Sequence, residues 1–467
     1  MDVDRFAVLV GERLRRPRRN ERRSRGERLA GALDSLIRSG DLRPATRLPA
    51  ERVLGAALGV SRGTVASAFD QLAAAGLVER RHGSGTYVRA AAPGPQPIFR
   101  RWLREGTVVV DLAKSVVPDP SLLPRLDLAV EDLLDAHPAD GYAFLGDSRL
   151  RGLLAEHAAP GAYGPDLLLV TSGAQQALHL VADALLQPGD RVLVEHATYP
   201  GMLAAIERFG GVPVAVHGDR YGFSPAAFAE AVAEHRPAYA FTMPVHNPTG
   251  SVTAERRAKA LAGIVRDADT LLVEDRTLAD LVLAEDAGPV ASAAAYAPDH
   301  TVCLGSLSKT LWGGLRVGWI AAPRQVFGPL AVAKQRTDLA SSALDQRLAV
   351  ALLADPDAAV RQAAWRERLR VRRDCLAGLL AEQLPSWSWT LPQGGMSLWV
   401  RLPGADGEEF AATAMRHGVA VSPGAVFAPP GSGAGDDRIR LSFAWPEPVL
   451  TEAVAMLAAA WAAHRAS

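Results

Sequence analysis

The sequence is poor in cysteine. Its two cysteines, Cys303 and Cys375, are too few for a disulfide framework and are not spaced as metal ligands. This excludes the class of small secreted proteins that disulfides hold together, and we expect no metal site. So little cysteine in a chain of this size fits a reducing compartment, so the expected location is the cytoplasm.

Long hydrophobic runs are also missing. No stretch of about 18 uncharged apolar residues occurs, which argues against a membrane span. The first residues are acidic and mixed rather than basic and then apolar, so a signal peptide is not expected. Hydrophobic residues nevertheless make up 48% of the 467 residues, which is ample for buried cores and too many for a disordered protein. The length suggests two or three domains.

Lysine is absent from the first 90 residues, where arginine supplies all the basic charge. This segment has 18 Arg against 10 Asp or Glu, although the whole chain balances 51 basic against 51 acidic residues. The rest of the chain must therefore carry the matching negative surplus. Such a split indicates one part that meets a polyanion and another that does not. A solvated basic face or a floppy tail would give the same count, so charge alone leaves both interpretations open.

The first 90 residues have the pattern of a small α+β domain. Apolar periodicity and turn residues predict helices at 27–39, 50–58 and 61–75, followed by strands at 77–81 and 86–88. Three helices and a β-hairpin describe a winged helix, which we place at residues 26–88. An Arg-rich extension of uncertain role precedes it at residues 1–25. The Pro-, Gly- and Ala-rich residues 89–108 are expected to form a linker.

Residues 40–88 follow one family pattern motif after motif. Residues 58–65 are Leu-Gly-Val-Ser-Arg-Gly-Thr-Val, and residues 83–88 are Gly-Ser-Gly-Thr-Tyr-Val. The segment resembles the GntR superfamily of winged-helix regulators, which implies binding to double-stranded promoter or operator DNA. A helix that starts at Ser61 would present its first turn to base edges and phosphates. The expected DNA contacts are Arg43, Arg47, Arg52, Ser61, Arg62, Thr64, Gly83 and Gly85.

Beyond residue 109 the pattern changes to short apolar runs separated by helical segments. The runs lie at residues 167–170, 191–195, 238–242, 271–274 and 301–304. This alternation predicts an α/β domain with a mainly parallel sheet that helices cover on both faces. Later strands at 396–401 and 438–443 indicate a smaller α/β subdomain. We therefore divide residues 109–467 into a large part, about 130–340, and a small part, about 341–467.

One of the four lysines has a distinctive setting after a predicted strand. Residues 305–318 are Gly-Ser-Leu-Ser-Lys-Thr-Leu-Trp-Gly-Gly-Leu-Arg-Val-Gly, with Lys309 in fifth place. This resembles the cofactor segment of fold-type I aminotransferases, and it implies that Lys309 forms a Schiff base (aldimine) with pyridoxal phosphate (PLP). The resemblance also implies that Ser306 and Arg316 bind the cofactor phosphate, which an arginine can grip with two hydrogen bonds. An ordinary exposed lysine would leave these neighbours unexplained.

Other segments of the same family pattern arrive in the expected chain order. Residues 171–178 follow a strand and open a helix, where backbone amides can hold a phosphate at the positive helix end. The resemblance implies cofactor contacts by Gly173, Ala174 and Gln175, by Tyr199 on the ring, by Asn247 on the phenolic oxygen and by Asp275 on the pyridine nitrogen. A carboxylate at the last position keeps the ring protonated, so that the ring can accept electrons.

Two further residues are expected to complete the site, and one position departs from the pattern. Tyr142 resembles the tyrosine that reaches the cofactor phosphate of the partner subunit. Arg440, in Arg-Ile-Arg-Leu-Ser-Phe, is the candidate clamp for an α-carboxylate. Many aminotransferases carry a tyrosine two residues after the ring-nitrogen acid, but here that position is Thr277. Threonine is too short to reach the phenolic oxygen as tyrosine does, which puts efficient transamination in doubt.

The order of these parts resembles the MocR subfamily of GntR regulators over almost the whole chain after residue 26. The resemblance implies a homodimeric regulator whose effector is PLP itself, or an amine or amino acid that reacts at Lys309. One alternative is an active aminotransferase with a vestigial DNA-binding module, against which the intact DNA motif argues. Another is a DNA-binding protein whose C-terminal part only dimerises. The combination of Lys309, Asp275 and Arg316 argues against it.

Overall fold

Two units make up the chain in the computed structural model, unit 1 (Met1–Gly94) and unit 2 (Pro95–Ser467). The division falls inside the expected linker. The structure describes residues 6, 10, 25–38, 42, 46–74, 77–81, 85–88, 109–116, 123–124, 141–158, 161–219, 221–284, 290–429, 432–433 and 435–466. Among those residues, none of the helices combines the length and the hydropathy that a membrane span requires.

Unit 1 has the helices and hairpin that the sequence predicts. Its elements are α2 (Arg25–Arg38), α3 (Glu51–Leu58), α4 (Arg62–Ala74), β1 (Val78–Arg81) and β2 (Gly85–Val88). Leu33, Leu54 and Phe69, one from each helix, are buried in a common core. Gly59 ends α3 with a φ of 65°, a left-handed conformation that glycine adopts without strain. β1 and β2 pair antiparallel, which confirms the predicted winged helix.

The central sheet of unit 2 has seven strands in the order β4-β12-β11-β10-β9-β5-β6. Their bounds are β4 (Leu168–Thr171), β5 (Arg191–Glu195), β6 (Val212–Val216), β9 (Tyr239–Thr242), β10 (Leu271–Asp275), β11 (Thr301–Ser306) and β12 (Gly318–Ala321). Only β12 runs against the others in this sheet. The prediction of a mainly parallel sheet is therefore confirmed, although β6 and β12 lie outside the predicted strands.

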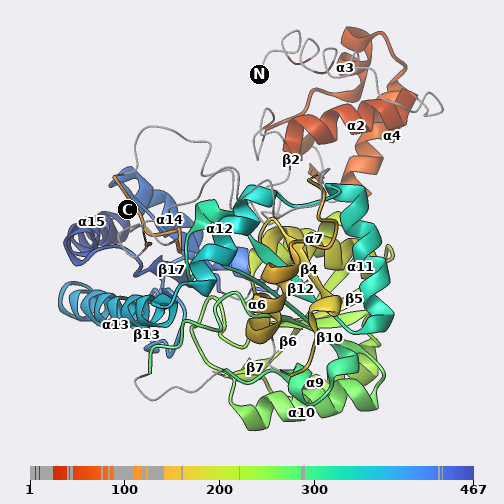
Figure 1. Cartoon of the computed structure of the whole chain (residues 1–467). Helices are drawn as coiled ribbons and strands as arrows, with labels where there is room; N and C mark the ends of the chain where they lie inside the picture. The colour runs from red at the N-terminus through yellow and green to blue at the C-terminus, as the bar shows by residue number, and fades with distance from the viewer. Residues whose placement is uncertain are drawn as a thin grey trace. The chain divides into compact units, whose positions relative to one another are not determined.

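Helices cover both faces of this sheet (Figure 1). They are α6 (Ser148–Ala158), α7 (Ala174–Leu185), α8 (Pro200–Arg208), α9 (Pro225–His235), α10 (Glu255–Asp267), α11 (Arg324–Thr337) and α12 (Ala343–Ala354), with a short hairpin of β7 (Gly218–Asp219) and β8 (Gly222–Phe223). Val192 and Val194 pack with α7 and α8, whereas Leu193 between them packs with α9 and α10. Successive strand residues point to opposite faces, so an all-apolar strand must be covered on both.

A second, smaller sheet forms the C-terminal part, in the order β13-β14-β17-β16. Its elements are β13 (Ser388–Trp389), β14 (Ser397–Arg401), β16 (Ser422–Pro423), β17 (Arg438–Ser442), α13 (Ala358–Gln383), α14 (Gly407–Arg416) and α15 (Glu447–Ala466). Figure 1 shows these three helices gathered on one side of unit 2. The small part begins with α13 rather than near residue 341, because Ala349 and Val350 of α12 pack in the core beneath the large sheet.

The first described segment of unit 2 belongs to the small part, not to the large one. β3 (Val110–Asp111) pairs in parallel with β15 (Val419–Ala420). Leu112, which follows, is fully buried in the core that α13 and α15 share. The chain that enters from the linker is therefore fixed to the small subdomain before it reaches the large sheet.

Candidate cofactor and DNA-binding sites

Lys309 lies directly beyond the carboxyl end of β11, among charged groups from three other segments. Its Nζ donates a hydrogen bond of 2.6 Å to the backbone oxygen of Ser115. Burial and the nearby charge of Arg440 lower the pKa of Lys309 to about 8, while Asp275 opposes the shift and Arg316 adds to it. A lysine with this pKa has an appreciable neutral fraction near neutral pH, so it can act as a nucleophile.

Asp275 reaches the same place from β10. Because β10 and β11 are parallel neighbours, with Asp275 opposite Leu304, their carboxyl ends lie at one edge of the sheet. The backbone N–H of Thr277 donates to Asp275 Oδ1 at 2.9 Å. Burial raises the pKa of Asp275, and hydrogen bonds from Thr277 and the charge of Lys309 counteract the rise. The structure thus brings the expected acid and the expected lysine together.

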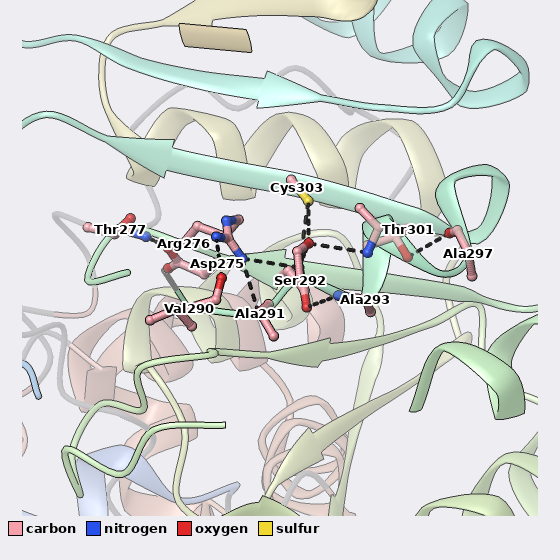
Figure 2. A network of polar contacts seen from close by, with 12 residues as sticks. Asp275, Arg276, Thr277, Val290, Ala291, Ser292, Ala293, Ala297, Thr301 and Cys303 are labelled. Atoms are coloured by element: carbon pink, nitrogen blue, oxygen red, sulfur yellow. Dashed lines mark hydrogen bonds and ion pairs between the residues drawn. The ribbon is translucent and has the colours of Figure 1, made fainter. Parts of the chain in front are cut away.

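Glu274 and Arg276, on either side of Asp275, form a buried polar network that the sequence interpretation missed (Figure 2). Glu274 accepts hydrogen bonds from the Ser292 hydroxyl and from a backbone N–H of the same loop, and it lies 3.7 Å from Arg276 Nη1. Arg276 in turn donates to the backbone oxygen of Val290 at 3.1 Å. The network ties the end of β10 to residues 290–293 and so fixes the backbone that carries Asp275. No sequence signal marked it, since its partners come from an unremarkable loop.

The expected phosphate-binding residues converge at the start of α7. Gly173 caps this helix with a φ of 116°, and Ala174 is its first residue. The Arg316 guanidinium donates to the backbone oxygen of Ser172. A Cβ on Gly173 would lie 2.9 Å from Arg316 Nη2, so only glycine lets this guanidinium close over the helix end. Ser306 Oγ lies 2.8 Å from Ser308 Oγ beside them.

Tyr199 contacts Gln175, which lies in the first turn of α7. The Tyr199 hydroxyl donates to Gln175 Oε1 at 3.2 Å. Burial and the charge of Asp275 raise the pKa of Tyr199 to about 12, with Arg440 opposing. The phenol therefore stays protonated and acts as a donor. Because Asp275 and Arg440 both affect this pKa, Tyr199 lies close to these site residues. Tyr142 is 60% exposed, and its expected reach into a partner subunit stays a prediction.

Arg440, on β17 of the small subdomain, faces the same site. Its Nη1 donates to Asn247 Oδ1 at 3.1 Å, and its Nη2 donates to the backbone oxygen of Ala113 at 2.6 Å. Arg440 also lies over the Phe427 ring, 4.9 Å from its centroid. Because Arg440 occupies the amide oxygen of Asn247, the NH₂ group of Asn247 is the end that can donate to a ligand oxygen.

These residues fit PLP. The buried Ser115 Oγ has no hydrogen-bond partner among the described residues, and a buried polar atom of this kind calls for a ligand or water. The Gly173 cradle and Arg316 suit a phosphate, and the Asn247 amide suits an oxygen acceptor. The sequence interpretation gave no role to Ala113 and Ser115, because their part in the site rests on backbone oxygens, which no side-chain motif reveals.

The expected DNA-binding residues that are described lie around the start of α4. Ser61 Oγ accepts from Thr64 N at 3.1 Å and so caps this helix. The Arg62 side chain is 76% exposed, and its pair with Glu51 at 3.3 Å is a surface ion pair that a phosphate can replace at little cost. Arg52 is exposed on α3.

The wing contributes the remaining DNA-binding candidates. A Cβ on Gly85 would lie 3.1 Å from Arg47 Nε, so the Arg47 guanidinium lies against the wing backbone. Arg43 and Gly83 fall outside the described residues, and their roles stay predictions.

Both halves match known families. Residues 107–457 match the family described as aminotransferase class I and II, and residues 25–88 match the bacterial regulatory proteins of the gntR family. The chain belongs to the aminotransferase class I and II family. Its GntR domain makes it a transcription regulator with an aminotransferase-like domain.

Relatives of two kinds resemble this regulator. It is 30% identical to the HTH-type transcriptional regulator TauR of Rhodobacter capsulatus, over 84% of this chain and 87% of that protein. It is 32% identical to 2-aminoadipate transaminase of Thermus thermophilus, over 70% of this chain and 84% of that protein. Among solved structures, α-aminoadipate aminotransferase LysN of Thermus thermophilus, complexed with N-(5′-phosphopyridoxyl)-L-leucine, matches with a TM-score of 0.70 and 28% identity. That match covers 79% of this chain and 95% of LysN. The fold and these neighbours identify PLP as the cofactor of the regulator's aminotransferase-like domain.

The lowered pKa of Lys309 predicts how PLP uptake depends on pH. Only the neutral amine attacks an aldehyde, so uptake by cofactor-free protein should accelerate as the pH rises and level off above about 8. Stopped-flow absorbance would measure the rate. Arg440→Gln should move the midpoint upward, because it removes a cation that disfavours protonation. A wild-type midpoint near 10.5, the ordinary lysine value, would contradict the assignment.

The exposure of Arg62 predicts a change in the salt dependence of DNA binding. Arg62→Ala should weaken operator binding and reduce the slope of log affinity against log salt by about 0.9, the contribution of one phosphate contact. Fluorescence anisotropy at several salt concentrations would measure it. Arg324→Ala, which removes an equally exposed charge from unit 2, is the control and should leave the slope unaltered. If Arg62→Ala has the same slope as the wild type, Arg62 does not contact a DNA phosphate.

Proposed function

We propose that the chain is a PLP-dependent transcription regulator that senses PLP, or an amine or amino acid effector, at Lys309 and passes the signal to its DNA-binding domain. The grouping of Lys309, Asp275 and Arg440 and the exposure of Arg62 support the proposal. The observation that carries the proposal is the path of residues 109–116, called the strap here. This segment joins the linker to the small subdomain and to the site.

The strap is anchored to the small subdomain at several points. Val109 N and Val110 N donate to the backbone oxygen of Gly418 at 2.9 and 3.1 Å. Further along, Trp445 Nε1 donates to the backbone oxygen of Asp111 at 2.9 Å, and Ser442 N donates to that of Leu112 at 2.8 Å. A displacement of the small subdomain must therefore move the end of the linker with it.

The same strap touches both functional groups of the site. The backbone oxygen of Ala113 accepts from Arg440, and that of Ser115 accepts from Lys309. A carboxylate on the effector would compete with Ala113 for Arg440 and would form the stronger, charge-assisted bond. This favours an α-amino acid as the effector, with its carboxylate on Arg440 and its amine toward Lys309.

The cofactor adds a reactive group to this arrangement. When bound, PLP supplies an aldehyde that combines with amines and a ring that draws electron density. Asp275 would hold a proton on the ring nitrogen, Asn247 would donate to the phenolic oxygen and Arg316 would bind the phosphate. Effector binding then favours one arrangement of strap and small subdomain over another, which is a shift between two populations.

The regulator is proposed to act as a homodimer with cofactor sites at the subunit interface. Arg316 is exposed, as are Trp312 and Tyr142. An exposed arginine in a phosphate site can be covered by a second subunit, which would shield the phosphate from water. Two winged helices in one dimer would read two half-sites of an operator.

An active aminotransferase with a vestigial DNA-binding module is the alternative. The similarity to 2-aminoadipate transaminase and the presence of Lys309, Asp275 and Arg440 favour it. Thr277 in place of tyrosine argues against efficient turnover, and the exposed face of α4 argues against a vestigial module. Steady turnover of an amino acid with a keto acid would favour the enzyme over the sensor.

The role of Lys309 can be tested by absorption spectroscopy together with operator binding. Lys309→Ala should lose the visible, borohydride-sensitive absorbance of the loaded protein, and amino acids should no longer change its operator affinity, because no amine side chain holds the cofactor. Lys259→Ala, on α10, is the matched control and should behave as wild type. If Lys309→Ala and wild type absorb alike, the cofactor assignment is wrong.

The strap can be tested separately through Trp445. Trp445→Phe keeps an aromatic side chain and removes the hydrogen bond to Asp111, which is worth about 1 kcal/mol. The variant should keep the spectral response to an effector but show a weaker change in operator affinity, measured by anisotropy on the same samples. Trp389→Phe, on β13 of the same subdomain, should keep both responses. Undiminished coupling in Trp445→Phe would rule out the strap as the route.

A further inference from the structure

His246 joins two loops that enter the cofactor site from different strands. Its Nδ1 lies 2.7 Å from Thr249 Oγ1, in the loop after β9. Its Nε2 lies 2.9 Å from the backbone oxygen of Ala197, in the loop after β5. A carbonyl oxygen only accepts, so Nε2 is the donor in this contact. Both ring nitrogens are therefore used, one for each loop.

A buried carboxylate holds this imidazole in place. Glu195 Oε2 lies 3.2 Å from His246 Nε2, with both side chains less than 10% exposed. The other oxygen of Glu195 accepts from Thr242 Oγ1 at the end of β9, at 3.3 Å. Burial alone would lower the pKa of His246, but the charge and hydrogen bond of Glu195 and the bond to Ala197 raise it overall. Glu195 thus counteracts the effect of burial on this ring.

The two loops carry the residues that would meet opposite parts of the cofactor ring. Tyr199 lies two positions after Ala197 and caps α8 at Pro200. Asn247 follows His246 directly, and Arg440 holds its amide oxygen from the far side. By joining the two loops, His246 determines the spacing between Tyr199 and Asn247. Among the described hydrogen bonds, none joins His246 to either of these two side chains.

We propose that His246 is a positioning residue, whose ring fixes the Tyr199 loop against the Asn247 loop so that stacking on the PLP ring and the bond to its phenolic oxygen occur together. The inference rests on the cofactor site of the proposed function, but not on DNA binding or on the effector. Without the ring, Glu195 would keep a buried, unpaired charge and the two loops would separate.

The proposal is tested by PLP titration of the full-length, cofactor-free protein. His246→Gln should weaken PLP binding about tenfold, the loss expected for one well-placed hydrogen bond. It should also shift the pH at which the visible band of the loaded protein changes, in the same direction as Asn247→Ala does. His300→Gln is the control, because His300 bonds the backbone of Thr270, at the opposite end of β10 from the site.

A double-mutant cycle separates positioning from a general effect on stability. If His246 acts through Asn247, the double variant should lose less affinity than the product of the two single losses. Strictly multiplicative losses, or a drop in melting temperature with PLP affinity and band titration intact, would overturn the proposal.

A milder variant covers the case in which His246→Gln does not fold. Thr249→Val removes the partner of Nδ1, together with the contacts of the same hydroxyl to Ser251, and should weaken PLP binding severalfold. Wild-type affinity in Thr249→Val would count against the proposal. Wild-type protein that takes up no PLP at all would refute the proposed function itself, which keeps the two failures apart.

Discussion

The parallel course of β5, β9, β10 and β11 is the constraint on which the site depends. Strands that run the same way present their carboxyl ends at one edge of the sheet, and the loops that leave them meet there. Tyr199, Asn247 and Lys309 follow β5, β9 and β11, and Asp275 is the last residue of β10. Residues far apart in the sequence therefore share one site.

Electrostatics then gives the site its chemical character. Three cationic side chains, Lys309, Arg316 and Arg440, surround one carboxylate, Asp275, and the imbalance helps to lower the pKa of Lys309. A site with this surplus attracts dianionic phosphate and a carboxylate and keeps the lysine reactive. Two other buried carboxylates, Glu274 and Glu195, lie 3.7 Å from Arg276 and 3.2 Å from His246. Their partners hold loops that border the site.

The proposed regulation depends on the position of the strap. A GntR domain precedes the strap in this chain, so in our proposal a group that competes for Arg440 also acts on the segment that follows the linker. The proposed coupling needs no long chain of contacts. Arg440, the candidate ligand for the effector carboxylate, and Ser442, which holds the strap, lie on the same strand of the small sheet. We propose that this strand connects effector binding to promoter binding.

The sequence by itself determined the local elements, the order of the domains and most residues of the site, because strand periodicity, helix caps and the motifs around Lys309, Asn247 and Arg440 are local features of the chain. It missed β12, whose antiparallel course depends on its neighbours β4 and β11. It also placed α12 in the small part, because only packing shows which core a helix joins. The roles of Ala113, Ser115, Arg276 and His246 were decided by tertiary structure alone. Their contacts are backbone oxygens and buried charges brought together by folding, and such contacts follow no spacing along the sequence.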